Sequence, residues 1–165
     1  MNPLLVHYNN HFNTPVGIRN ISNISNTFNC DIVSSVNSPA VLKKISLSAL
    51  ENFGNFYWHA ISGYLTFPVQ TAVKYKIPLI IWGENSQQEY GGPNLDSVKN
   101  TILNRKWLEE FGGLLGNRVQ DMIGVNGITE KELTPYFYPS DEDIETPDLE
   151  NDPYAKYYED EEDED

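Results

Sequence analysis

The stretch IPLIIWGEN at residues 77–85 decides the expected fold, because a short, continuous apolar run ends there in a glycine, a carboxylate and an amide. Such a run is typical of a strand buried on both faces of a parallel sheet, where ligands bind beyond the carboxyl ends of the strands. Gly83 would permit a tight turn, while Glu84 and Asn85 would supply an anionic acceptor and a mixed donor and acceptor. On spacing alone, a plain loop is an equally good interpretation.

A second polar cluster follows a few residues downstream. Tyr90, Gly91 and Gly92 come after Glu89 and before a proline, which predicts a glycine-rich turn with an aromatic ring beside it. This turn favours the ligand-binding interpretation of the whole stretch.

The chain upstream alternates short apolar runs with amphipathic segments. Thr14 is a favourable N-cap and Pro15 fits the first helical position, so a helix is expected to begin there. The alternation predicts an α/β fold, a parallel sheet with flanking helices. The expected strands are residues 4–8, 32–36 and 77–82, and the expected helices are 15–28, 38–54 and 56–76, the last with a possible kink at Pro68.

Short helices are expected beyond Gly92, at residues 96–104 and 105–115. Thr129 and Glu132 fit a capping box at the start of a further helical turn. All of these elements are assigned to one domain, residues 1–140. Residues 141–165 lack apolar periodicity and are expected to form a disordered acidic tail.

The net charge of −13 is concentrated in that tail, which holds 14 acidic residues and one lysine, whereas residues 1–140 hold ten charges of each sign. A neutral body offers no electrostatic footprint for nucleic acid, and the tail would repel it. The single cysteine, Cys30, excludes a disulfide framework and is expected to be a small buried hydrophobe. With no secretory signal and no apolar run of about 18 residues, a cytoplasmic protein without membrane contacts is expected.

Several motifs together carry a family resemblance over roughly residues 2–140. The chain is similar to the N-acetyl sugar amidotransferases of lipopolysaccharide, surface-polysaccharide and flagellar nonulosonic acid biosynthesis, which belong to the PP-loop ATP pyrophosphatase superfamily. The most specific part is the pair formed by GEN at 83–85 and EYGG at 89–92. The other matching stretches are LLVHYNN (4–10), FNT (12–14), GIRN (17–20), FNCD (28–31) and IPLIIW (77–82).

Two departures from the family pattern matter. The family's serine-glycine-glycine-lysine-aspartate-serine loop, whose backbone amides grip the pyrophosphate of ATP, has no counterpart in this sequence. Met1 stands where that loop and its helix should already have passed, so the expected PP-loop-type sheet is incomplete at its N-terminus. The resemblance also fades after residues 139–140. The chain therefore resembles the middle of an enzyme.

The resemblance implies an ATP-dependent, ligase-type transferase chemistry. The family adenylates the carbonyl oxygen of a sugar acetamido group, and ammonia from a glutaminase partner then displaces AMP to give an acetamidino group. Adenylation matters because an amide oxygen is a very poor leaving group. ATP, usually with Mg²⁺, and an N-acetylated sugar are therefore the implied ligands, held in line by the protein.

The resemblance also assigns roles to individual residues. Tyr8, Asn9 and Asn10 would form a lip for the adenosine at the end of the family's second strand. Glu84 would be the catalytic residue, as a magnesium ligand or as an acceptor of a proton from ammonia. The remaining binding residues are Gly83 and Asn85, near the sugar or the phosphates, with Glu89, Tyr90, Gly91 and Gly92 around a sugar pocket. No metal ligand is assigned beyond that option for Glu84.

Three interpretations of the whole chain remain open. It is an amidotransferase fragment that works with a complementing N-terminal half on another chain, or a non-catalytic interaction module whose acidic tail contacts basic partners. The third is a truncated gene product without independent function, since removal of the first strand would expose a sheet edge. In each case the isolated chain is expected to hydrolyse no ATP. The phosphate-binding loop of the family is missing, and no other stretch of the sequence supplies clustered backbone amides with a lysine to replace it.

Overall fold

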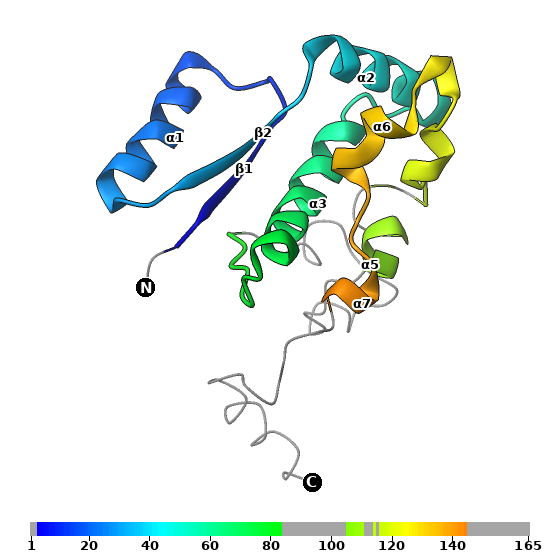
Figure 1. Ribbon diagram of the computed structural model, residues 1–165. Helices are drawn as coiled ribbons and strands as arrows, with labels where there is room; N and C mark the ends of the chain where they lie inside the picture. The colour runs from blue at the N-terminus through cyan, green and yellow to red at the C-terminus, as the bar shows by residue number, and fades with distance from the viewer. Residues whose placement is uncertain (1–2, 84–104, 111–113, 115, 145–165) are drawn as a thin grey trace, which may run out of the picture.

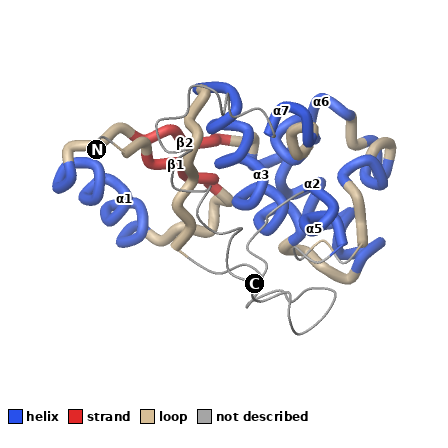
Figure 2. Tube along the Cα trace, turned by 90° about the horizontal axis from the view of Figure 1, so that it is seen from below, coloured by secondary structure: helices blue, strands red, loops and turns tan. Residues whose placement is uncertain are grey.

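The computed structural model describes residues 3–83, 105–110, 114 and 116–144. A small sheet with helix α1 forms one side of the molecule, and a cluster of helices forms the other (Figures 1 and 2). The elements in chain order are β1 (Leu5–Asn9), α1 (Pro15–Phe28), β2 (Ile32–Val36), α2 (Pro39–Phe53), α3 (Trp58–Tyr75), α5 (Arg105–Glu110), α6 (Glu130–Leu133) and α7 (Asp141–Ile144), with 3-10 turns at Val119–Met122, Val125–Gly127 and Thr134–Tyr136.

The sheet has two parallel strands in the described part of the chain, with Leu5 opposite Ile32 and Asn9 opposite Val36. The predicted α/β class is therefore confirmed in its coarse form, as a parallel pair of strands among helices. Both strands begin and end within one residue of their expected limits.

The prediction of a third strand at residues 77–82 is wrong. This segment forms neither strand nor helix, and Leu79 and Ile81 are 60 % and 79 % exposed. An apolar run becomes a strand only where a neighbouring strand offers backbone partners, and in the part of the chain that is described this segment pairs with none. Local composition suited a buried strand, but the described residues offer no strand beside which this segment would be buried.

Helix α1 is capped as the sequence predicts. Thr14 Oγ1 accepts a hydrogen bond from Gly17 N at 3.1 Å, and Pro15 occupies the first helical position. The structure describes every residue of α1, and none of them is buried. The reason is geometric: two strands about 5 Å apart are too narrow to cover a helix about 10 Å wide. Ile18, Ile24 and Phe28 remain exposed in consequence.

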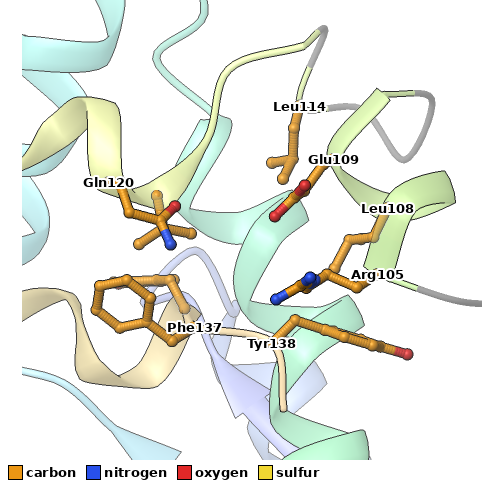
Figure 3. A pocket seen from close by; sticks show the side chains of 9 residues that line it. Arg105, Leu108, Glu109, Leu114, Gln120, Phe137 and Tyr138 are labelled. Carbon is orange, nitrogen blue, oxygen red and sulfur yellow. The ribbon is translucent and has the colours of Figure 1, made fainter. Parts of the chain in front are cut away.

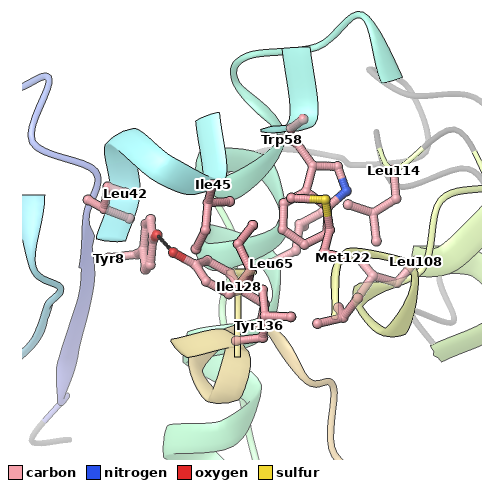
Figure 4. Close-up of a cluster of buried hydrophobic side chains, with 13 residues drawn as sticks. Tyr8, Leu42, Ile45, Trp58, Leu65, Leu108, Leu114, Met122, Ile128 and Tyr136 are labelled. Atoms are coloured by element: carbon pink, nitrogen blue, oxygen red, sulfur yellow. Dashed lines mark hydrogen bonds between the residues drawn. The ribbon is translucent and has the colours of Figure 1, made fainter. Parts of the chain in front are cut away.

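The core lies between α2, α3 and the turns that follow α5 (Figure 4). Trp58 is buried, as predicted, and Cys30 is a buried free thiol, also as predicted. The predicted N-terminus of α3 is two residues too early, and Pro68 lies inside the helix. The largest fully buried apolar side chains are Trp58, Tyr136, Ile45, Leu65, Leu108, Leu114, Met122, Ile128 and Leu133.

The C-terminal expectations are met in part. The helix expected at 105–115 is present from Arg105 to Glu110, whereas residues 111–113 and 115 and the helix expected at 96–104 lie outside the described residues. Disorder was expected from residue 141, but Asp141–Ile144 forms the short helix α7. Residues 145–165 are not described. Among the described helices, none is both long enough and apolar enough to cross a bilayer.

Gly63 allows α3 to lie against β1. The ring of Tyr8 packs so closely on Gly63 that a Cβ at this position would overlap it. Tyr8 is itself 7 % exposed, so the ring has little room to withdraw. The contact between sheet and helical core therefore requires the absence of a side chain at residue 63.

Gly63→Ala is expected to lower the free energy of unfolding by about 1 to 3 kcal/mol, because overpacking displaces Tyr8. Urea-induced unfolding followed by circular dichroism measures the change. The matched control is Gly17→Ala in α1, where a Cβ meets only Thr14 Oγ1 at 3.6 Å and Asn13 Oδ1 at 3.8 Å, so stability should be unchanged or slightly higher. Equal stability of the two variants would contradict the packing described above.

A partly exposed ion pair connects α2 to α6. Lys44 Nζ donates to both carboxylate oxygens of Glu132, at 2.7 and 2.8 Å, and to the carbonyl of Gly127 at 3.1 Å. Glu132 also accepts from the backbone and hydroxyl of Thr129, which completes the predicted capping box. Lys44 first, and then Thr129, lower the pKa of Glu132 to about 2.

Glu132→Gln is expected to destabilise the protein at neutral pH. A carboxyl group with a lowered folded-state pKa stabilises the fold above its unfolded-state pKa, and that contribution is lost as pH falls toward 2. The difference in unfolding midpoint between wild type and variant should therefore shrink between about pH 4.5 and pH 2. Glu130→Gln, which removes the same charge from the same helical turn, serves as the control and should show no such convergence.

Candidate functional site

A groove of about 370 Å³ opens beyond the carboxyl ends of β1 and β2, between the β1–α1 loop, α2 and the start of α3. This volume lies in the range of small-molecule sites. The ends of parallel strands are also where α/β proteins bind their ligands. Its lining residues are Asn10, His11, Phe12, Pro39, Leu42, Lys43, Ser46, Leu47, Leu50, Phe56 and His59.

Asparagine side chains fix the loop that forms one wall of the groove. Asn9 Oδ1 accepts from His11 N, and Asn10 Oδ1 accepts from Phe12 N, each at 3.0 Å. His11 adopts a left-handed backbone conformation, with φ of 62°, and its Nε2 donates to the carbonyl of Asn37 at 2.9 Å. These short-range bonds are the Asx turns that Asn side chains favour. They hold Phe12 at the groove.

Aromatic rings line the same wall. Phe12 stacks on Tyr57 with centroids 5.5 Å apart, and its ring centroid lies 6.0 Å from that of His59. Tyr57 in turn accepts a hydrogen bond from Asn10 Nδ2 at 3.2 Å. Phe12 remains 54 % exposed, so part of its ring surface is available to a ligand. Lys43 adds a positive charge at the rim, since its side chain is exposed.

His59, in α3, lines the groove, and only 1 % of the residue is exposed. Its Nδ1 lies 3.4 Å from the hydroxyl of Tyr8. The Tyr8 hydroxyl in turn lies 2.9 Å from the hydroxyl of Tyr136, the hydrogen bond drawn as a dashed line in Figure 4. Burial, and then the charge of His11, lower the pKa of His59 to about 4. Burial also raises the pKa of Tyr8 to about 12 and the pKa of Tyr136 further. All three groups are therefore uncharged at neutral pH.

The structure brings together three of the site residues expected from the sequence. Asn10 lines the groove, Asn9 shapes its loop, and Tyr8 lies beneath it in the core, where its hydroxyl faces protein groups. Gly83 is exposed and ends the segment at 77–83, which lies at the opposite end of α3 from the groove (Figure 1). Glu84, Asn85, Glu89, Tyr90, Gly91 and Gly92 lie outside the described residues, so their expected roles stay predictions.

Sequence reasoning missed Phe12, Lys43, Tyr57 and His59. The three histidines, His7, His11 and His59, stand at no spacing typical of a metal site, so the sequence gave no signal for His59. Phe12 and His59 are 47 positions apart and meet only because α3 begins beside the end of β1. The Asn-rich loop directly after a strand was the one local signal for this site.

A second, much smaller cavity of about 40 Å³ lies between α5 and the segment that follows α6 (Figure 3). Arg105, Glu109, Gln120 and Tyr138 contribute polar side chains to it. A cavity of this size has room for water but not for a sugar or a nucleotide. The groove is therefore the better candidate for ligand binding.

The magnesium and triphosphate implied by the sequence resemblance do not fit the described residues. No group of three or more His, Cys, Asp or Glu side chains in the described ranges is placed to hold a metal ion. The groove is lined mainly by apolar side chains, and its polar side chains are Asn10, His11, Ser46 and His59, with Lys43 as its ammonium group. A triphosphate needs clustered amides or several cations, so no catalytic step through ATP or Mg²⁺ is derived.

No protein-family model, curated protein or solved structure matches the chain. The family resemblance noted in the sequence is therefore neither supported nor contradicted by these comparisons.

The buried, neutral His59 predicts a specific acid sensitivity. Its folded-state pKa of about 4 lies below the unfolded value of 6.5, so unfolding takes up a proton between these pH values and stability falls as pH falls. One proton corresponds to a slope of at most about 1.4 kcal/mol per pH unit. Urea midpoints from pH 7 to 4 should fall less steeply in His59→Gln than in wild type. If the urea midpoints of the two proteins fall in parallel with pH, His59 does not cause the acid sensitivity.

Proposed function

We propose that the chain is the central part of an N-acetyl sugar amidotransferase of the PP-loop type, acting in surface-glycan biosynthesis as a nucleotide-binding unit without independent catalysis. The observation that carries this proposal is the groove at the carboxyl ends of two parallel strands, with Asn10 in its wall. This is the position at which an α/β sheet binds a nucleotide.

The described residues support the nucleoside half of such a ligand better than the phosphate half. Phe12 offers an aromatic face, and Leu47 and Leu50 offer apolar walls. Lys43 at the rim is suited to a single phosphate. A complementing chain would have to supply the glycine-rich phosphate loop, and a glutaminase would have to supply ammonia. The resemblance implies an N-acetylated sugar near Glu84 and Asn85, but the preceding residue, Gly83, lies at the opposite end of α3 from the groove, so the proposal is confined to nucleotide binding.

A non-catalytic interaction module is the second candidate. Phe12, Leu47, Leu50 and Phe56 are each about half exposed and gather around one groove. Exposed apolar side chains concentrated on one surface often mark binding sites for protein segments. The two candidates differ in the ligand of the groove, so a binding experiment separates them.

Titration of the purified chain with AMP, followed by saturation-transfer NMR and calorimetry, tests the proposal. We expect weak binding that Lys43→Ala reduces severalfold through loss of the phosphate contact, while Lys131→Ala on α6 leaves it unchanged. Absence of AMP binding by the wild-type chain would favour the interaction module. Release of pyrophosphate from ATP by the chain alone, dependent on an acetamido sugar, would overturn the non-catalytic part of the proposal.

A further inference from the structure

His59 occupies an unusual position for an imidazole. It is almost fully buried, yet it lines the groove. Its Nδ1 faces Tyr8, and within the described residues Nε2 has no hydrogen-bond partner. Because the two ring nitrogens lie on opposite sides of the imidazole, Nε2 is the atom left for a ligand. The fully buried polar side-chain atoms without a partner in the described residues are Trp58 Nε1 and Ser62 Oγ, so His59 Nε2 differs from them in reaching the groove, where a ligand would replace water.

We infer that this groove selects ligands that carry a planar heteroaromatic ring. The edge of that ring forms a hydrogen bond with His59 Nε2, and its face packs against Phe12. This inference rests on the proposed nucleotide-binding function and adds to it the residue that reads the base. The ring centroids of Phe12 and His59 are 6.0 Å apart, so one planar ligand can contact both.

The apolar walls of the groove disfavour a sugar ring as its ligand. A pyranose carries hydroxyl groups around its whole edge, and against Leu47, Leu50 and Phe56 most of these would lose water without a new partner. A nucleobase has two apolar faces and confines its polar atoms to the edge, which matches a groove with apolar walls and few polar side chains, namely Asn10, His11, Lys43, Ser46 and His59. The groove is therefore better suited to the base than to the sugar of a nucleotide.

Tyr8 and Tyr136 position this imidazole. If Tyr136 donates to Tyr8, then Tyr8 donates to His59 Nδ1, and Nε2 presents an N–H to the ligand. In the reverse direction, His59 Nδ1 donates to Tyr8, and Nε2 presents a lone pair. Tyr136 is held in place because its carbonyl accepts from Thr66 Oγ1 at 3.4 Å. The direction of the hydrogen bonds between the two hydroxyl groups and His59 therefore determines which imidazole tautomer a ligand meets, and Tyr8 acts as a positioning residue.

The test compares adenosine, AMP and ribose 5-phosphate, which lacks the base. We expect His59→Phe to weaken adenosine and AMP binding about tenfold, the loss of one hydrogen bond, and His59→Gln to retain more of it. Ribose 5-phosphate should bind weakly and equally to all three proteins. Unchanged adenosine affinity in folded His59→Phe would overturn the inference but leave the proposed nucleotide binding intact. Absence of AMP binding by the wild type would overturn both.

A second measurement does not depend on how the His59 variants fold. The ¹⁵N shifts of the His59 imidazole in the wild-type chain should move when adenosine is added, and Tyr8→Phe should change the tautomer ratio before any ligand is present. Tyr138→Phe, which removes the hydroxyl of a half-buried tyrosine that lines the smaller cavity, is the matched control and should leave the His59 shifts unchanged. Adenosine binding without any shift of the His59 nitrogens would overturn the inference.

Discussion

The contact of Tyr8 with the helical core is the constraint on which the rest of this structure depends. Its ring lies against Gly63 of α3, and its hydroxyl bonds to Tyr136, which is 128 positions away in the chain. Without this contact, the β1–α1–β2 unit would have little to hold it to the helices, since α1 buries none of its residues. One tyrosine of β1 thus joins the two sides of the molecule, and its buried hydroxyl is satisfied by His59 and Tyr136 of the helical side.

The same contact creates the groove. Because Tyr8 fixes β1 along α3, the loop after β1 meets the start of α3, and Asn10 reaches Tyr57. Phe12 is thereby carried to His59, and α2 closes the opposite wall with Leu47 and Leu50. The groove and the core are consequently coupled through His59, whose ring contacts both. A ligand in the groove would be linked through this histidine to the packing that stabilises the fold.

The narrow sheet leaves apolar side chains exposed on its side of the molecule. In the described residues β1 and β2 have no further neighbour, and the apolar side chains of α1 and of segment 77–83 stay exposed. Exposed strand edges and apolar side chains favour association with other chains. These exposed edges and side chains are the surfaces to which the complementing chain of the proposed function would bind.

The sequence by itself determined the elements that short-range interactions specify. Thr14 and Pro15 set the start of α1, Gly54 the end of α2, and Thr129 with Glu132 the capping box, since each of these signals acts within a few residues. Tertiary structure decided the rest. Residues 77–82 carry a strand-like composition but lack a strand to pair with, and His59 joins Phe12 only through the packing of α3 on β1. Pairing and burial depend on residues far apart in the chain, whose meeting no local pattern encodes.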